Sequence, residues 1–457
     1  MRRTAWLGLL MGAGICVGCA QAQGLDGVVT ATSGSLDLST AQRETLEHSP
    51  AYRKALAQEQ EASWGHAEAL SEGFLPHVSV EGTYYLNNRY AKEGMALAPS
   101  APSEAFIENF PDANLTLDAE LVIFDGLRNV HRLGAAKDQT EAARLLSRWT
   151  AFQEQQEVRL AFYKALAARK QSEMADENVK TLQDHLRIVD DLMQNGQATK
   201  YDVLRVEVQL SEAKSDQISY HDNVILSRER LSQAMGLPMD DRSLQGELPV
   251  VDPALVLGKL SKVDFAERPD LKANDFQAQA AEKRSAADAA FWVPQVSLIG
   301  EVQWYDRQDA STVDPNNIIN TGHLDDSYYV GASVKWDLFD GGVSWAKSKE
   351  AHAKADAAKA DRDEARMKAP YDYDLWRRTL VSKASLYQAR LTDIDKAKES
   401  ARLATLGFTA GTRTTTDVLD AELEVFKATA GMVQAQVDAL EALINLEITL
   451  GGRINRE

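Results

Sequence analysis

Cysteine is nearly absent from this sequence, and the two that occur, Cys16 and Cys19, lie close to its amino terminus. They fall in a segment that starts with two arginines, is apolar over residues 5–17 and ends with small residues up to Ala22. This pattern is typical of a secretory signal peptide. We therefore expect residues 1–22 to be removed, and the exported remainder to contain no disulfide and no thiolate metal site.

Cys19 leaves a second processing route open, because a cysteine that follows a Val-Gly pair is also a site for lipoprotein cleavage. The residue three positions before it is Cys16 instead of the aliphatic residue that such sites prefer. Cleavage after Ala22 is the favoured interpretation, and lipidation of Cys19 is the alternative.

Acidic residues outnumber basic ones, 68 to 50, and long apolar runs are scarce. The formal net charge is −18, and loss of the two leader arginines makes the mature chain more negative still, so we expect no binding to nucleic acid. No segment after the leader has the roughly 18 consecutive apolar residues that a membrane helix needs. If the mature chain enters a membrane, only a closed β-barrel satisfies its backbone hydrogen bonds there.

Catalytic and metal-binding patterns are missing as well. The eight histidines show no paired metal-ligand spacing, and we interpret them, among them His48, His66, His185 and His221, as surface residues. The sequence has no glycine-rich phosphate loop and no convincing Ser, His and Asp arrangement. It therefore predicts a protein that is not an enzyme and that uses no cofactor and no metal.

What the sequence does contain is an internal repeat. Short matching segments recur in the same order in both halves, and the last three pairs share one offset, the separation between Phe124 and Phe339. The matches are 74–80 with 292–298, 124–126 with 339–341, 201–204 with 416–419, and 235–236 with 450–451. We therefore predict a tandem duplication, with a first structural repeat over residues 23–250 and a second over residues 251–457.

Each repeat is predicted to contain a helix, a β-hairpin, a very long helix and another long helix. In the first repeat the last three are expected at about 75–125, about 127–194 and about 199–236. In the second repeat the four elements are expected at about 266–292, about 293–340, about 343–406 and about 415–450. At about 1.5 Å per residue, each very long helix extends for on the order of 100 Å.

Alternation of apolar and polar residues indicates the strands. One apolar face contains Leu115, Leu117, Ala119, Leu121 and Ile123, and segments that start at Val296 and Tyr328 alternate in the same way. Segments of about ten residues with aromatics at their ends are typical of a lipid-facing barrel wall. Alternation alone fits a soluble β-sandwich equally well, and the lack of a second sheet favours the barrel.

Apolar residues at three-four spacing predict that the helices pack as coiled coils. The longest such stripe consists of Leu419, Leu423, Phe426, Ala430, Val433, Val437, Leu440 and Ile444. For the stripe alone, a simple dimeric coiled coil is the plainer interpretation. Pro370 falls inside the second very long helix, where it removes a backbone hydrogen bond, so we predict a kink or break there.

Four strands per chain form an open sheet with two edges, which lipid does not tolerate. Two copies would supply eight strands and three would supply twelve, and only the larger barrel leaves an aqueous lumen. The predicted fold class is an α+β membrane protein with an internal duplication. Its four β-strands per protomer would join a trimeric 12-stranded β-barrel, continued by a long periplasmic α-helical coiled-coil barrel.

The segment Gly407 to Ala421, GFTAGTRTTTDVLDA, resembles the signature of the TolC family of outer-membrane efflux proteins. The two Phe-Asp-Gly steps and the duplication resemble that family too, over essentially the whole mature chain. The resemblance implies a homotrimer in outer-membrane lipid with a periplasmic helical tunnel, whose entrance opens by untwisting of helix pairs. It also implies docking to a periplasmic adaptor protein and to an inner-membrane transporter, either an ATP-binding cassette (ABC) pump or a proton-driven pump.

Asp417 and Asp420 are three residues apart and share a helix face, so a threefold assembly would stack their carboxylates in two rings. The residues alone favour a plainer role, in which acids in the first turn stabilise the helix N-terminus. The resemblance implies instead that they line the constricted periplasmic entrance. We then expect an entrance that prefers cations, with some pKa values raised by crowding of like charges.

The resemblance also implies that Arg413 and Asp202 link neighbouring helix pairs and hold the entrance shut. The plainer alternative is a solvated surface pair of little energy. Phe408 stands where a tyrosine hydroxyl normally joins this network, which puts one bond of the latch in doubt. Lys200 is close enough in sequence to Asp202 to be a candidate substitute donor.

The function that follows is passive conduction of a substrate from an inner-membrane pump and its adaptor to the exterior. The substrate class stays open between type I protein secretion and small-molecule efflux. The alternative from another class is an exported coiled-coil structural or adhesive protein. That alternative explains the long helices and the leader but not the repeated hairpins.

Overall fold

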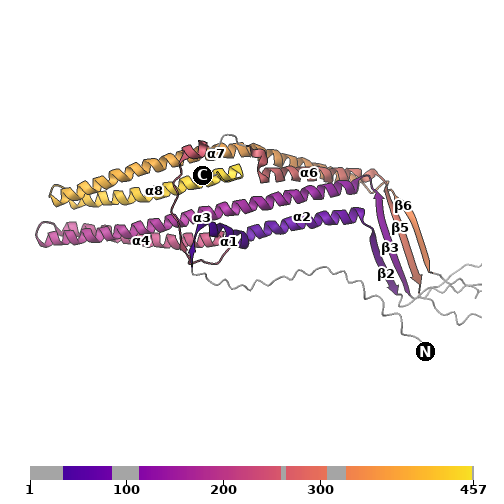
Figure 1. The fold of residues 1–457 in the computed structure, drawn as a ribbon, viewed down its shortest axis with the longest axis horizontal. Helices are drawn as coiled ribbons and strands as arrows, with labels where there is room; N and C mark the ends of the chain where they lie inside the picture. The colour runs from indigo at the N-terminus through magenta and orange to yellow at the C-terminus, as the bar shows by residue number, and fades with distance from the viewer. Residues whose placement is uncertain (1–33, 85–112, 259–263, 306–325, 455–457) are drawn as a thin grey trace, which may run out of the picture.

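The computed structural model describes residues 34–84, 113–258, 264–305 and 326–454. The predicted signal peptide with Cys19, and the ends of both predicted hairpins, lie outside the described residues. The molecule is elongated, with its main sheet at one end and long helices that run away from it (Figure 1).

The order of helix, strand pair, long helix and helix occurs twice along the chain. The first half contains β1 (Ser35–Leu36), α1 (Leu38–His48), α2 (Pro50–Phe74), β2 (His77–Tyr84), β3 (Ala113–Phe124), α3 (Arg128–Gln194) and α4 (Lys200–Ala234). The second half contains β4 (Ser243–Leu244), α5 (Pro253–Gly258), α6 (Pro269–Ala289), β5 (Gln295–Tyr305), β6 (Ser327–Lys335), α7 (Val343–Thr409) and α8 (Thr415–Leu450), with 3₁₀ turns at Phe265–Glu267 and Ala290–Trp292. Both α3 and α7 have 67 residues.

The two Phe-Asp-Gly steps are the turns that connect a strand to a long helix. Gly126 and Gly341 both have a φ of +72°, a conformation that glycine adopts without steric cost. The aspartate before each glycine accepts a 2.8 Å hydrogen bond from a backbone N–H in the first helical turn, Asp125 from Asn129 and Asp340 from Ser344. Each step therefore reverses the chain and caps the helix that follows.

The main sheet has the order β2-β3-β5-β6, and every neighbouring pair is antiparallel. The β3–β5 pair joins the two halves of the chain. The register sets Leu117 opposite Val80 and Val302, and Val302 opposite Tyr328, so most apolar residues of the four strands lie on one face. Much of this face is uncovered, with Val330 85% and Tyr328 81% exposed.

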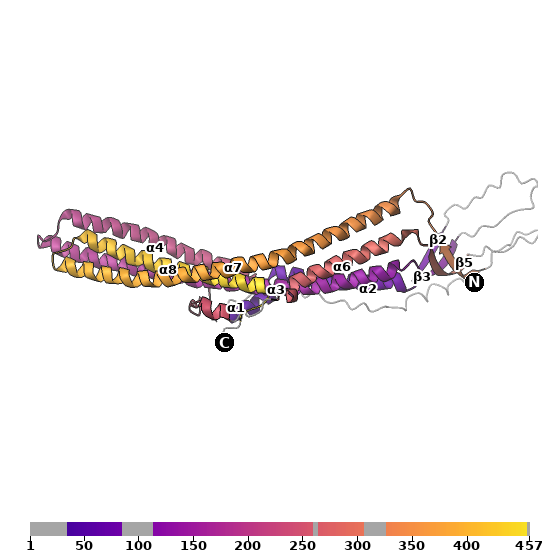
Figure 2. The same cartoon turned by 90° about the horizontal axis from the view of Figure 1, so that it is seen from above.

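The helices form two long hairpins, α3–α4 and α7–α8, whose tips lie at the end of the molecule opposite the sheet (Figures 1 and 2). Helix α3 packs against α4, α2, α6 and α8, whereas α7 packs chiefly against α8 and α6. Within the described ranges, none of the helices is long and apolar enough to cross a membrane.

Of the kink or break predicted at Pro370, the break is wrong, because α7 continues through this residue as one helix. Two contacts close to the proline hold the helix together. Ala369 is buried, and Arg366 forms a 2.7 Å ion pair with Asp275 of α6. The long hairpin contacts of α7 with α8 and α6 on either side of Pro370 keep the helix in place despite the missing backbone hydrogen bond.

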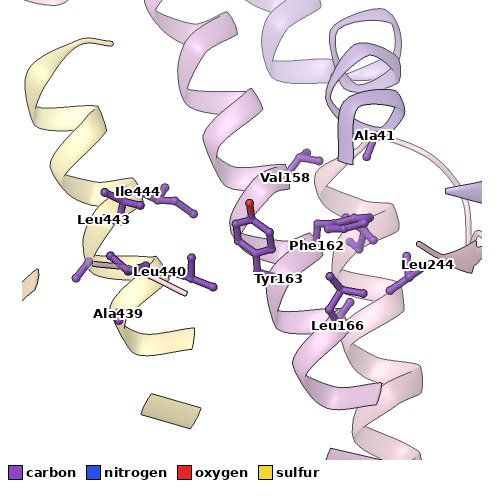
Figure 3. Packing of buried hydrophobic residues seen from close by; sticks show 14 of the residues in the cluster. Ala41, Val158, Phe162, Tyr163, Leu166, Leu244, Ala439, Leu440, Leu443 and Ile444 are labelled. Atoms are coloured by element: carbon purple, nitrogen blue, oxygen red, sulfur yellow. The ribbon is translucent and has the colours of Figure 1, made fainter. Parts of the chain in front are cut away.

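The main core lies midway along the helices, where α3 meets α8 and the short β1–β4 pair. Phe162 and Leu166 face Leu244 on one side of α3, and Leu440 and Leu443 of α8 lie on the other side (Figure 3). A buried ion pair between Arg159 of α3 and Glu447 of α8 flanks this core. It joins the two halves of the chain by charge as well as by apolar contact.

Candidate functional site at the helical hairpin tips

The predicted entrance residues gather at the tips of the two helical hairpins. Each tip turns at a glycine with positive φ, Gly196 at +73° in the first and Gly411 at +71° in the second. Figure 1 shows the two tips next to each other, at the far end from the sheet. The sequence segments that were expected to form one site therefore do come together, although they belong to different halves of the chain.

Both tips begin their second helix with the same capping box. Asp202 accepts hydrogen bonds from the backbone N–H (2.9 Å) and the hydroxyl (2.6 Å) of Thr199. Asp417 accepts the equivalent bonds, both of 2.8 Å, from Thr414. Within one chain, Asp417 thus has the plainer of its two predicted roles, stabilisation of a helix N-terminus, and Asp202 has the same role, which was not predicted for it.

Arg413 lies over Gly407, which is a feature of the second tip alone. A β-carbon at Gly407 would lie 2.5 Å from Cγ of Arg413, so a larger residue at that position would displace the arginine. The corresponding positions in the first tip hold Leu192 and Ala198. Because Gly407 has no side chain, the side chain of Arg413 can lie against the helix backbone at this position.

The charged partner of Arg413 within the chain is Asp417, with 3.7 Å between Nη1 and Oδ1. Among the described residues, no ion pair joins Arg413 to Asp202, and none joins Lys200 to Asp202. Lys200 is exposed, as is Asp420, the second predicted ring residue. The latch predicted from the resemblance is therefore not formed inside a single chain, and it stays a prediction about neighbouring copies.

The pKa of Asp417 differs from what crowding was expected to produce. The backbone N–H and the hydroxyl of Thr414, with a smaller contribution from Arg413, hold this pKa below its ordinary value. The crowding that would raise it needs the carboxylates of other copies. A single chain therefore presents Asp417 as a fully ionised group at neutral pH.

Phe408 lies between the two hairpins instead of in a polar network. It packs against the apolar cluster of α3 and α4 and also against Val418 and Ala421 of α8. Its ring stands 5.6 Å from the ring of His185 of α3, centroid to centroid. The residue that lacks the tyrosine hydroxyl thus forms an apolar connection between the hairpins.

The interpretation of His185 as a surface residue is wrong, because only 5% of it is exposed. Its position next to the stripe of Leu182, Leu186 and Val189 was a signal for burial that the absence of metal-ligand spacing obscured. Burial lowers the pKa of His185. Sequence reasoning also missed Glu422, whose place one turn beyond Leu419 on the apolar stripe of α8 was the available signal.

Metal binding has no support in the part of the chain that the structure describes, where no three His, Cys, Asp or Glu side chains are grouped closely enough to hold an ion. What the tips offer is a set of exposed carboxylates and one arginine over a buried apolar contact. Such a surface suits the conduction of ions or polar substrates better than it suits catalysis.

The chain is similar in sequence to a known secretion protein and in fold to known outer membrane proteins. The chain is 22% identical over 295 residues to the alkaline protease secretion protein AprF of Pseudomonas aeruginosa, a match that spans 64% of this chain and 60% of that protein. Its fold is similar to that of the outer membrane protein VceC of Vibrio cholerae, with a TM-score of 0.73, 18% identity and coverage of 92% and 97% of the two chains. It is also similar to the Campylobacter jejuni CmeC outer membrane channel, with a TM-score of 0.71, 13% identity and coverage of 92% and 86%.

The family model described as outer membrane efflux protein matches residues 42–237 and 264–452, which include both hairpins and the sheet. The repeated order of elements, the paired tips and the exposed apolar sheet face all lie inside these two segments. The chain therefore belongs to the outer membrane efflux protein family, whose members include the TolC-like channels.

Proposed function

We propose that three copies of this chain form an exit duct in the outer membrane, which passively conducts substrate from an inner-membrane pump and a periplasmic adaptor to the exterior. The observation that carries this proposal is the apolar face of the main sheet. Val330, Tyr328 and Val334 are 85%, 81% and 67% exposed on it. A contiguous apolar surface of this kind marks a contact with lipid or with another protein.

The edges of the sheet support assembly into a closed ring. In the described residues, β2 pairs only with β3 and β6 pairs only with β5, so both outer edges are free for other strands. Lipid does not tolerate such edges. Two copies with four strands each would give an eight-stranded barrel and three would give a 12-stranded barrel, and of the two only the 12-stranded barrel leaves an aqueous lumen.

The helices support a tunnel that continues the barrel. Apolar side chains remain exposed along α4 and α7, among them Tyr201, Val208 and Ile218 on one and Met367 and Leu403 on the other. In the trimer these residues would pack against helices of neighbouring copies. We attribute the equal length of α3 and α7 to the tandem duplication, with one repeat over residues 23–250 and the other over residues 251–457.

The entrance of the tunnel would lie at the hairpin tips. Asp417 and Asp420 of three copies would form two acidic rings, and Arg413 would connect to Asp202 of an adjacent helix pair, with Lys200 close by. Because Phe408 has no hydroxyl, the polar part of this latch has one bond fewer than in the family pattern. Closure then depends more on the apolar contacts of Phe408 itself.

The substrate class we favour is an unfolded protein exported by a type I secretion system. The support is the name of AprF, an alkaline protease secretion protein, which matches 64% of this chain. The partners would then be a periplasmic adaptor and an ABC transporter. Cross-linking in intact cells followed by purification of the chain tests this choice, because recovery of a proton-driven pump in place of an ABC transporter would favour small-molecule efflux.

Single-channel recording in planar bilayers tests the duct itself. Purified protein should insert as a trimer and conduct cations in preference to anions, with block by divalent ions added on the side of the tips. Asp417→Asn with Asp420→Asn should remove the divalent block, and Arg413→Ala should raise the conductance. Unchanged conductance and block in the double variant would remove the acidic rings from the proposal, and absence of any conductance in the parent would contradict the duct.

A further inference from the structure

Two ionisable side chains near the hairpin tips each have a buried polar atom without a hydrogen-bond partner. They are His185 of α3, which is buried and whose Nε2 atom is unpaired, and Glu422 of α8, which is half-buried and whose Oε2 atom is buried and unpaired within the described structure. A buried polar atom without a partner costs stability, so its presence calls for an explanation. Neither residue is part of the capping boxes, the acidic rings or the latch.

Glu422 lies on the face of α8 that meets the other hairpin. Leu419, three residues before it, belongs to the apolar cluster formed by α3 and α4. Phe426, four residues after it, contacts Tyr220 of α4 edge-on, with 6.0 Å between ring centroids. Residues at this spacing share one helix face, so Glu422 lies between two side chains that pack against the α3–α4 hairpin.

His185 occupies the same boundary from the other side. Its ring contacts Phe408 of α7, and Phe408 also packs against Val418 and Ala421 on α8, one turn before Glu422 or less. We call the set of His185, Phe408, Leu419 and Glu422 the tip contact. Its members come from α3, α7 and α8, so separation of the two hairpins exposes both ionisable groups to water.

Among the described residues, no ion pair compensates either group. Burial raises the pKa of Glu422 to about 7 and lowers the pKa of His185, and burial is the cause in both cases. Tyr220 of α4 is uncharged at neutral pH, its own pKa being raised by burial and by Asp216. The charged groups that flank the boundary on α3, α7 and α8 are exposed and paired with each other, as Asp184 with Arg187, Glu399 with Arg402, and Arg413 with Asp417.

We propose that His185 and Glu422 are a pair of opposing proton-sensitive groups, each of which offsets the effect of the other on the pH dependence of hairpin-tip closure. The tip contact forms when both side chains are uncharged, and each is charged once the hairpins separate. This inference rests on the proposed function in one respect, that separation of the hairpins opens the duct.

The two groups act with opposite sign. Between pH 4.5 and about 7, Glu422 keeps a proton in the closed form that it releases in the open form, so a rise in pH favours opening. Below pH 6.5, the open form binds a proton at His185 more readily than the closed form does, so a rise in pH favours closure. Between pH 4.5 and 6.5 the two effects therefore oppose each other, because opening favours release of a proton from Glu422 and uptake of a proton by His185.

Removal of either ionisable group should therefore reveal the pH dependence that the other group gives to closure. Glu422→Gln keeps the shape of the side chain and leaves His185, so the closed fraction should increase with pH between 4.5 and 6.5. His185→Phe keeps the ring contact with Phe408 and leaves Glu422, so the closed fraction should decrease with pH over the same interval. Each slope should approach roughly a tenfold change in the open-to-closed ratio per pH unit, and the double variant should have none.

Distance measurement between spin labels gives a readout that does not depend on conductance. Asn195→Cys and Thr412→Cys place one label on each exposed tip of the full-length trimer, which has no other cysteine once the leader is removed. Glu424→Gln, an exposed acid on the same helix, is the matched control and should behave as the parent. His185→Gln is the second variant at position 185, for the case that the phenylalanine variant does not assemble.

The outcomes separate the inference from the proposed function. Opposite slopes in the two single variants support the tip contact as a pH-compensated closure. Slopes of the same sign, or slopes equal to that of the parent, overturn it. A protein that shows the opposite slopes in label distance but conducts no ions in a bilayer retains the inference and contradicts the duct.

Discussion

Helices α3 and α7 have the same length of 67 residues and the same place in the order of elements that occurs twice along the chain, yet their surroundings differ. Twenty residues of α3 are buried and only seven of α7. Helix α3 lies between α2, α4, α6 and α8, whereas α7 forms one side of the protomer. Equivalent position in a repeat therefore does not give equivalent burial, and α7 is the helix that a neighbouring copy has room to cover.

The largest difference between the two helices should appear in their ion pairs to α8. Glu447 pairs with Arg159 of α3 in a site where the arginine and glutamate side chains are only 8% and 1% exposed. Glu447→Ala leaves the arginine buried and unpaired, and we expect a loss of about 3–5 kcal/mol in the free energy of unfolding. Denaturant titration in detergent, followed by circular dichroism, measures the loss.

The matched control is the pair that connects α8 to α7. Asp438 lies 2.8 Å from Lys383, and the lysine and aspartate side chains are 38% and 27% exposed. Asp438→Ala should cost far less than Glu447→Ala, because water can solvate the lysine that remains. Equal losses in the two variants would contradict the view of α3 as interior and α7 as boundary.

An intermediate effect is expected from the uncovered side of α7. Leu403 and Leu406 are 54% and 52% exposed in one protomer, and burial by a neighbour would stabilise the trimer by roughly 1 kcal/mol for each half-buried side chain. Leu403→Ser with Leu406→Ser should therefore leave the protomer folded and shift the trimer toward monomer in analytical ultracentrifugation. Lys398→Ser, an exposed change on the same helix, should not.

The smallest effect should be equal at the two tips, where the halves of the chain are alike. Thr199→Ala and Thr414→Ala each remove a capping hydroxyl of nearly the same geometry. Each should lower local helix stability by about 1 kcal/mol. Hydrogen exchange of the first-turn amides of α4 and α8 compares them, and a much larger effect at Thr414 would indicate that Arg413 and Gly407 depend on its cap.

Local patterns in the sequence were enough for much of this architecture. Three-four spacing predicted very long helices at about 127–194 and 343–406, and the helices observed span Arg128–Gln194 and Val343–Thr409. Spacing carries this information because the helices are amphipathic over their whole length. The capping role of Asp417 followed from residue type and position in the same way.

Local patterns could not predict the contacts between segments that are distant in the sequence. Phe408 in the other half of the chain helps to cover His185, and α7 packs against α8 and α6 where Pro370 interrupts its hydrogen bonds. Nothing in the local sequence at either position reports its partner. The residues that sequence reasoning misjudged are thus those whose environment is made by distant parts of the chain.

The equal length of α3 and α7 has a consequence for how this chain can change. Each residue advances a helix by about 1.5 Å and turns it by roughly 100°, so deletion of a single residue from α3 alone would shift and rotate its tip relative to that of α7. The contact between His185 and Phe408 would then be lost even with every side chain retained. A shorter or longer version of the molecule that keeps this contact therefore needs matched changes in α3, α4, α7 and α8, in steps that preserve the faces by which these helices pack.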